Sequence, residues 1–319
     1  MVAIRRLAVL DDYTHVAASY ADWDALRERG VEVEFHHEPL GDRLIDALAG
    51  VDAIAAMRER TPFDASTIAA LPALRLLVTT GMANASIDLA AAAARGVTVC
   101  GTPGSAPGAP ELTWALLLAA LRDLPAEERR LRDGLWQGGV GREADGLTLG
   151  IVGLGRIGTR IARYAHAFGM DVRAWSPHLD DARAASADAR RAESLIALAE
   201  SADVLTLHLR LAPSTREVVG ERVLRALGPD GLLVNTARAG LVDTAAMIRG
   251  LEEGWLGGAA LDVFDDEPIP AGDPILAAPR TVLSPHLGYV TTASYRAFYP
   301  AIVEDVLACL DGRPLRVIG

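Results

Sequence analysis

The chain has 319 residues with a formal net charge of −11, and half of the residues are hydrophobic. This length is sufficient for two domains of ordinary size, and the negative charge argues against nucleic acid or an anionic membrane as a partner, since both select a basic surface. All 31 basic residues are arginine. Enzymes that depend on a lysine (Schiff-base, pyridoxal-phosphate, P-loop and Ser-Lys enzymes) are therefore excluded.

The two cysteines and the N-terminal sequence bear on the cellular compartment. Cys100 and Cys309 form neither a disulfide framework nor a metal-ligand spacing, and we expect both to be small buried side chains. No stretch resembles a signal peptide, and no apolar run is long enough to span a bilayer. These features predict a cytoplasmic protein with no metal centre.

Short apolar runs alternate with helical patterns over the first hundred residues. The predicted strands are 7–10, 31–35, 53–57, 76–78 and 97–99, and the predicted helices are 20–29, 40–48, 65–71 and 87–95. Alternating strands and helices indicate a parallel sheet that is covered by helices. We therefore expect one α/β unit in this part of the chain.

A connection rich in glycine and proline, residues 101–110, interrupts this alternation and is typical of a hinge between domains. The helix predicted over 111–124 is apolar on nearly every side, and Pro110 fits its first turn. A helix without a polar face is buried all round. We expect it to lie between the domains, in a subunit interface, or partly in each, and an interface favours a homodimer.

A second alternating series begins at residue 147. Its predicted strands are 147–152, 171–175, 204–209, 232–235, 258–263 and 281–283, and its predicted helices are 157–168, 192–199, 222–226 and 244–253. This pattern predicts a complete doubly wound sheet. A last helix over 289–310, which we expect Pro300 to break or kink, should pack back on the first unit.

The first strand of this second series runs into a glycine pattern. Gly153, Gly155 and Gly158 form a G-x-G-x-x-G sequence between that strand and the next helix. The first glycine permits a tight turn, the second lets a pyrophosphate approach the backbone, and the third permits close helix packing. The alternative is an ordinary strand-turn-helix corner. The context favours a dinucleotide site, with phosphates at the helix N-terminus.

Three polar side chains follow successive strands of this sheet. Arg238, Glu267 and His286 come after strands 232–235, 258–263 and 281–283. Each alone is more often a surface charge, a turn or a structural residue. Together, at one edge of a sheet that carries a dinucleotide site, the three residues are suited to the reduction of a 2-oxo acid. Arginine binds the substrate carboxylate with two hydrogen bonds, and an imidazolium protonates the carbonyl oxygen. A carboxylate orients the imidazole.

The sequence resembles the D-isomer-specific 2-hydroxyacid dehydrogenases over nearly its whole length. The resemblance rests on the glycine pattern, Asn235 to Arg238, Leu261 to Pro268 and Ser284 to Gly288. It implies an α/β protein of two domains that close over the substrate, and a homodimer. A Rossmann doubly wound parallel sheet (residues 101–287, with an interface helix at about 110–124) would be inserted into a flavodoxin-like α/β substrate-binding domain (residues 1–100 and 288–319).

The resemblance also implies residue roles. Arg238 would bind the substrate carboxylate, His286 would be the acid/base, and Glu267 would be its partner. Substrate contacts from the first domain would come from Arg58, Gly81 and Asn84. The cofactor-binding residues would be Gly153, Gly155, Arg156, Ile157, Gly158, Ser176, His208, Thr215, Ala237 and Asp262, with Asp262 bonded to the nicotinamide carboxamide.

Some positions depart from the family pattern. Ser176 stands where NAD-specific enzymes carry an acidic residue, although Asp180 and Asp181 follow closely, so the cofactor is NAD or NADP. The 101–110 loop is unlike its usual form, and we expect no appended regulatory domain after Gly319. Formate dehydrogenases have glutamine in place of Glu267, which argues against formate oxidation.

We expect an NAD(P)-dependent oxidoreductase that interconverts a small 2-oxo acid and its D-2-hydroxy acid. Glyoxylate, hydroxypyruvate and 3-phosphohydroxypyruvate are candidate substrates. The alternative is a dinucleotide-sensing protein, similar to the related corepressors, with little turnover. Those corepressors keep the same three polar residues, but the long apolar surface loops that would favour a sensor are not evident in the sequence.

Overall fold

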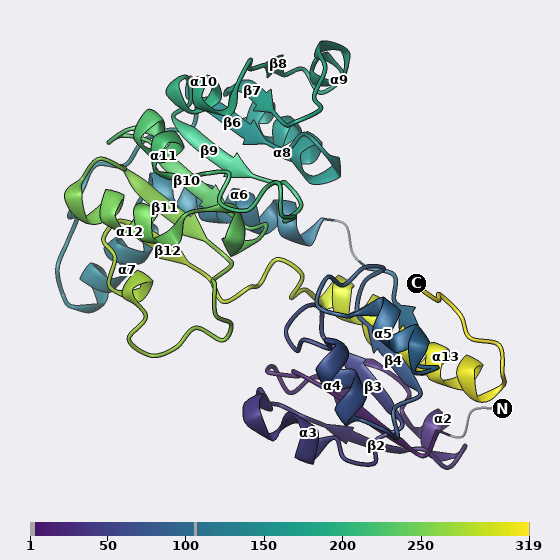
Figure 1. The fold of residues 1–319 in the computed structure, drawn as a ribbon. Helices are drawn as coiled ribbons and strands as arrows, with labels where there is room; N and C mark the ends of the chain where they lie inside the picture. Colours follow the sequence, from purple (N-terminus) through teal and green to yellow (C-terminus); the bar gives the residue numbers. More distant parts are fainter. Residues whose placement is uncertain (1–3, 105–106, 319) are drawn as a thin grey trace. The chain divides into compact units, whose positions relative to one another are not determined.

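The computed structural model describes residues 4–104 and 107–318. It comprises two compact units (Figure 1): unit 1 contains Met1–Ala106 and Val290–Gly319, and unit 2 contains Pro107–Tyr289. Ser105 and Ala106, which belong to the predicted hinge, lie outside the described residues. The predicted α/β class is confirmed, because each unit has one parallel sheet with flanking helices.

Unit 1 has a five-stranded sheet in the order β2-β1-β3-β4-β5, which is the flavodoxin-like order. Its strands are β1 (Arg6–Val9), β2 (Glu32–Phe35), β3 (Ala53–Ala56), β4 (Leu76–Thr79) and β5 (Thr98–Gly101). Every residue of β3 and β4 is buried, as continuous apolar runs predict for the centre of a parallel sheet. The helices are α1 (Ala17–Tyr20), α2 (Asp24–Arg27), α3 (Leu44–Ala47), α4 (Ala65–Ala70), α5 (Leu89–Ala94) and α13 (Thr292–Leu310), with the 3₁₀ turn η1 (Gly41–Arg43).

The C-terminal segment belongs to unit 1, and α13 packs against α1, α2 and β4. It runs through Pro300 without a break, so of the two expected outcomes, a break or a kink, the break is excluded. Tyr299 and Ala301 on either side are both buried, and this packing outweighs the missing N–H of the proline. After the helix, the chain pairs with the edge of β5, where the Ile318 N–H donates to the Val99 carbonyl at 2.8 Å.

Unit 2 has a seven-stranded parallel sheet in the order β12-β11-β10-β9-β6-β7-β8. The strands are β6 (Thr148–Val152), β7 (Asp171–Trp175), β8 (Arg190–Arg191), β9 (Val204–Leu207), β10 (Leu232–Asn235), β11 (Gly258–Leu261) and β12 (Thr281–Leu283). This is the Rossmann order with one added strand. The order reverses between β6 and β9, and ligands of such sheets bind beyond the strand ends at this switch point.

Helices cover both faces of this sheet. They are α6 (Gly108–Leu121), α7 (Leu124–Arg132), α8 (Arg156–Ala167), α9 (Asp181–Ala185), α10 (Leu195–Glu200), α11 (Glu221–Leu227) and α12 (Thr244–Glu253), with the 3₁₀ turns η2 (Ala239–Leu241) and η3 (Pro274–Leu276). Strand β10 shows the two cores: Leu232 and Val234 face the core with α6 and α8, and Leu233 faces the core with α10, α11 and α12. Period-two alternation thus buries apolar side chains on both faces.

Two further features differ from the sequence-based expectation. The sequence pattern did not predict β8, α7 or α9, and both residues of β8 are exposed. Helix α6 is not buried on every side within the chain, since Glu111 and Ala115 are exposed.

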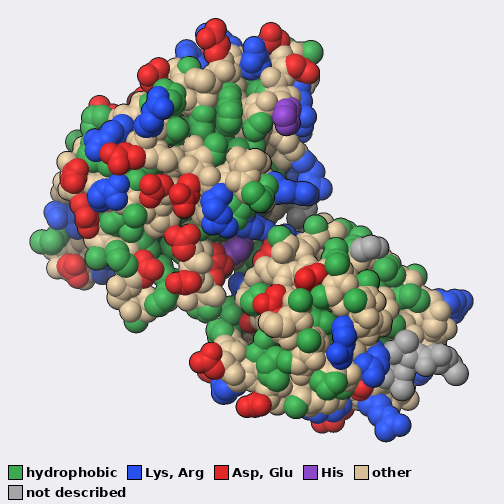
Figure 2. Space-filling view, in the orientation of Figure 1, with side chains coloured by type: hydrophobic (Ala, Val, Ile, Leu, Met, Phe, Trp, Pro, Cys, Tyr) green, Lys and Arg blue, Asp and Glu red, His purple; other side chains and the backbone are tan. Residues whose placement is uncertain are grey.

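Figure 2 shows acidic and arginine side chains mixed over the visible face rather than separated by sign. In the part of the chain that the structure describes, no helix has the length and hydropathy needed to cross a membrane.

Candidate active site

The glycine turn joins β6 to α8 and requires glycine for steric reasons. Gly153 has φ +101°, and a Cβ atom there would lie 2.8 Å from the His208 carbonyl carbon. A Cβ at Gly158 would lie 2.3 Å from the Gly153 oxygen, whereas a Cβ at Gly155 would meet nothing within 4 Å. The first and third glycines therefore permit close packing, and the second leaves open space beside the N-terminus of α8. This geometry fits a dinucleotide pyrophosphate.

The turn lies between the ends of β7 and β9. The Gly153 N–H donates to the Trp175 carbonyl at 2.8 Å, and the His208 N–H donates to the Val152 carbonyl at 2.8 Å. Burial lowers the pKa of His208 to about 3, so its imidazole is neutral. Its Nε2 atom lies 3.0 Å from the Thr206 hydroxyl. At the switch point, His208 therefore has a neutral ring, and its backbone packs closely against Gly153.

The end of β7 is where Rossmann proteins bind the adenine ribose. Ser176 directly follows this strand. The nearby acids are engaged elsewhere: Asp180 caps α9 by accepting from the Arg183 N–H at 2.7 Å, and Asp181 lies 2.5 Å from the Arg191 Nε atom. Arg156, at the first turn of α8, is exposed, and its side chain has no hydrogen-bonding or ionic partner within residues 4–104 and 107–318.

Arg238 is held by a turn that begins at the end of β10. The buried Asn235 side chain donates from Nδ2 to the Arg238 carbonyl at 2.9 Å and accepts from the Ala237 N–H at 3.0 Å. The Thr236 hydroxyl lies 2.6 Å from that of Thr113 on α6. Arg238 itself is half-buried, and its Nη1 atom donates to the Ala237 carbonyl at 2.6 Å. The turn is thus fixed from its own strand and from α6.

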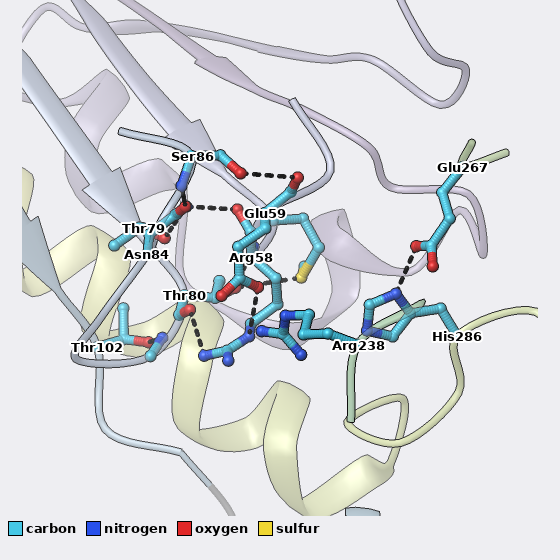
Figure 3. Close-up of polar contacts among 12 residues, drawn as sticks. Arg58, Glu59, Thr79, Thr80, Asn84, Ser86, Thr102, Arg238, Glu267 and His286 are labelled. Carbon is cyan, nitrogen blue, oxygen red and sulfur yellow. Dashed lines mark hydrogen bonds and ion pairs between the residues drawn. The ribbon is translucent and has the colours of Figure 1, made fainter. Parts of the chain in front are cut away.

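His286 and Glu267 are in contact, and Figure 3 marks their bond. The His286 Nδ1 atom lies 2.5 Å from Glu267 Oε2, and Glu267 Oε1 accepts from the Phe264 N–H at 3.0 Å. The side chains are 18% and 24% exposed, so the pair is only weakly screened by solvent. Because Glu267 occupies Nδ1, His286 can exchange a proton through Nε2, which has no partner among the described residues.

Asp262 follows β11 and is completely buried. Its carboxylate accepts from the Ser284 hydroxyl at 2.5 Å, the Leu287 N–H at 2.7 Å and the Gly288 N–H at 2.9 Å. Burial raises the pKa of Asp262, and the Ser284 hydrogen bond, the two N–H donors and the nearby His286 partly offset this effect. All three bonds go to the segment that carries His286.

A second constellation lies in unit 1, at the ends of β3, β4 and β5 (Figure 3). Arg58 has φ +53°, and its Nη1 atom donates to the Thr80 carbonyl at 3.1 Å. Asn84 donates from Nδ2 to the Arg58 carbonyl at 2.5 Å, and the Gly81 N–H donates to the Thr102 hydroxyl at 2.9 Å. The structure therefore brings Arg58, Gly81 and Asn84 together within this unit.

The structure places the remaining predicted residues as follows. The Thr215 hydroxyl donates to the Arg210 carbonyl at 2.7 Å and accepts from the Ala212 N–H, so it shapes the loop after β9. Ile157 packs against the core that contains α6 and α8. The sequence patterns assign no role to Thr113 or Ser284, although Ser284 belongs to the Ser284 to Gly288 motif, which could have indicated it. The described residues contain no metal-binding group of His, Cys, Asp or Glu side chains.

Comparison with known proteins identifies the family of the chain. Residues 114–288 match the family model described as "D-isomer specific 2-hydroxyacid dehydrogenase, NAD binding domain". A D-3-phosphoglycerate dehydrogenase from Mycobacterium bovis is 37% identical over 285 residues, which cover 88% of this chain and 53% of that protein. A glyoxylate reductase from Korarchaeum cryptofilum is 33% identical over 305 residues, which cover 89% of this chain and 90% of that protein.

Solved structures extend this similarity to the whole fold. A phosphoglycerate oxidoreductase from Vibrio cholerae is 37% identical, with a TM-score of 0.91 over 97% of this chain and 100% of the other. The chain spans about half the length of the mycobacterial relatives that it matches. The family model supports a nicotinamide dinucleotide as the cofactor. The chain belongs to the D-isomer-specific 2-hydroxyacid dehydrogenase family.

Proposed function

We propose that the protein is an NAD(P)-dependent oxidoreductase that interconverts a small 2-oxo acid and its D-2-hydroxy acid. The observation that carries this proposal is the His286–Glu267 pair. Glu267 follows β11, which pairs with the strand that precedes Arg238, and His286 follows β12, which pairs with β11. The sheet also carries the glycine turn. Acid/base, carboxylate-binding and dinucleotide-binding groups thus occur at one edge of one sheet.

When bound, the nicotinamide dinucleotide supplies hydride chemistry at C2 of the substrate. Arg238 binds the substrate carboxylate through two parallel N–H donors and so orients the carbonyl carbon. In the reductive direction His286 donates its Nε2 proton to the carbonyl oxygen, and in the oxidative direction it accepts that proton from the hydroxyl. Glu267 accepts the hydrogen bond from Nδ1–H and so orients the imidazole.

Unit 1 is proposed to bind substrate through Arg58, Gly81 and Asn84. The support is local: the Arg58 guanidinium is half-buried at the strand ends, and the Asn84 side chain fixes the Arg58 backbone. A cation at this edge suits a second contact with an anionic substrate. Glyoxylate, hydroxypyruvate and 3-phosphohydroxypyruvate are the substrates we propose to compare.

For the cofactor, we propose a preference for NADPH over NADH. Ser176 places no negative charge at the end of β7, and Asp180 and Asp181 are engaged in a helix cap and an ion pair. Arg156 is exposed on the adjoining helix turn and can pair with a 2′-phosphate. Titration of the protein with NADPH and NADH tests this: Ser176→Asp and Arg156→Gln should each weaken NADPH binding more than NADH binding. Equal losses for both nucleotides would contradict the preference.

We also propose a homodimer. Large apolar side chains are exposed along α7 and the loop that follows it: Leu131, Leu135, Trp136 and Val140. Trp136 is 74% exposed, which is unusual for an isolated soluble chain. A second copy of the chain can cover these side chains. Light scattering should give twice the chain mass, and Trp136→Asp should shift it towards the monomer; a monomeric wild type would contradict the proposal.

The same exposed segment also favours the alternative, a dinucleotide-sensing protein that binds other proteins. His286→Ala separates the two functions. An enzyme should lose most of kcat, by about 100-fold or more, and keep its dinucleotide affinity, because general acid catalysis is removed but the glycine turn is intact. Near-normal turnover in this variant would contradict the role of His286, and a wild type that binds dinucleotide without turnover would favour the sensor.

A further inference from the structure

The segment that carries His286 is fixed mainly by one buried carboxylate. Asp262 is completely buried, and its three hydrogen bonds go to residues on both sides of His286: Ser284 before it, and Leu287 and Gly288 after it. Buried carboxylates persist where hydrogen bonds satisfy them. The hydrogen bonds of this carboxylate thus all go to one short turn, residues 284–288.

The turn needs such support because His286 has φ +53°, in the left-handed region that residues with side chains rarely adopt. Strained residues of this kind persist only where the surroundings fix them, and they concentrate at functional sites. Gly288 allows the close approach, because a Cβ atom there would lie 3.2 Å from Asp262 Oδ2. The direction of the imidazole, and hence its bond to Glu267, depends on this backbone.

We propose that Asp262 and Ser284 are positioning residues that hold the His286 turn in its strained conformation. This inference rests on the proposed function of His286 as the acid/base. Asp262 acts through the backbone of the turn rather than on substrate. Ser284 completes the arrangement, because its hydroxyl satisfies the buried Oδ1 atom and anchors the start of the turn.

This role differs from the nicotinamide contact that the family resemblance implies for Asp262. An ionised carboxylate has about four acceptor sites, and three donors already occupy this one. The two roles predict different losses. A nicotinamide contact predicts weaker dinucleotide binding on substitution, whereas a positioning role predicts lower kcat with unchanged dinucleotide affinity.

The test uses Ser284→Ala, Ser284→Thr and Asp262→Asn in the full chain. Asp243→Asn is the matched control, because Asp243 also accepts a backbone N–H in unit 2, at the N-cap of α12. Ser284→Ala should lower kcat about 10-fold or more, because small misplacements of a catalytic group have effects of this size. Its dissociation constant for NADPH should stay within about 2-fold, and Ser284→Thr, which keeps the hydroxyl, should restore kcat.

Hydrogen exchange provides a readout that does not depend on activity. The Leu287 and Gly288 amides should exchange slowly in the wild type and faster in Ser284→Ala and Asp262→Asn, while Asp243→Asn should leave them unchanged. Unchanged exchange and unchanged kcat in Ser284→Ala would overturn the inference. So would an Asp262→Asn variant that weakens NADPH binding at least about 10-fold with normal kcat and normal exchange. A wild type inactive on every 2-oxo acid would contradict the proposed function instead, and exchange would still decide whether the carboxylate holds the turn.

Discussion

Gly81→Ala tests the substrate role of unit 1 by displacing Arg58 without replacing it. The added Cβ atom would lie 1.9 Å from Arg58 Nη1, and an ordinary contact needs at least 3.4 Å, so the guanidinium must move by about 1.5 Å. This movement also breaks the Nη1–H bond to the Thr80 carbonyl. Misplacement of a substrate-binding group by about 1 Å can cost about 100-fold in rate. We therefore expect kcat/KM for the 2-oxo acid to fall by about 10- to 100-fold.

The control is Gly96→Ala in the same unit. Gly81 and Gly96 both have positive φ, +88° and +67°, so alanine should cost about 1–2 kcal/mol of stability at either position. A Cβ atom at Gly96 meets nothing within 4 Å. Steady-state kinetics with saturating dinucleotide, together with thermal melts of both variants, separate the two effects. Equal kcat/KM values for Gly81→Ala and Gly96→Ala would refute a substrate role for Arg58.

Three further substitutions test other parts of the account. Glu267→Gln should lower kcat by about 10- to 100-fold at unchanged dinucleotide affinity, because His286 loses the carboxylate that bonds its Nδ1 atom. A kcat equal to that of the wild type would contradict the pairing. Arg238→Lys should raise KM for the 2-oxo acid and lower kcat together, because lysine cannot form two parallel hydrogen bonds to a carboxylate; unchanged kinetics would refute the assignment. Burial raises the pKa of Asp305 to about 6, although Arg316 partly opposes it, so the folded state binds the proton more tightly than the unfolded state. The wild type should therefore lose about 2 kcal/mol of stability relative to Asp305→Asn as the pH rises from about 4 to about 6.5, and parallel melting temperatures across this range would contradict the shift.

Sequence patterns predicted most of the fold because apolar periodicity is a local property. The β10 to β12 strands are short apolar runs that end in polar residues, and the residues that follow them carry the candidate site. Strand β8 could not be found in this way, since its two arginines are exposed and carry no periodic signal. The continuity of α13 through Pro300 could not be predicted from the sequence, because tertiary packing, which a local rule ignores, outweighs one missing hydrogen bond.

The residues of the candidate site could be predicted from the sequence, but their backbone conformation and hydrogen bonds could not. Motif and strand-end position identified Glu267 and His286 as candidate residues. The left-handed backbone of His286, and the hydrogen bonds that Asp262 accepts from its turn, depend on β11 and β12 ending side by side at one edge. Arg58 was indicated only by family resemblance, because nothing in its local sequence distinguishes it from an ordinary surface arginine.

The central claim is that this chain reduces 2-oxo acids with a nicotinamide dinucleotide. The most direct measurement follows absorbance at 340 nm with purified wild-type protein, supplying NADPH and NADH separately with glyoxylate, hydroxypyruvate and 3-phosphohydroxypyruvate, and identifies the enantiomer of the product. We expect substrate-dependent oxidation of the dinucleotide, faster with NADPH, that yields the D-2-hydroxy acid. Binding of both dinucleotides without oxidation by any of these acids, or formation of the L-product, would contradict the account.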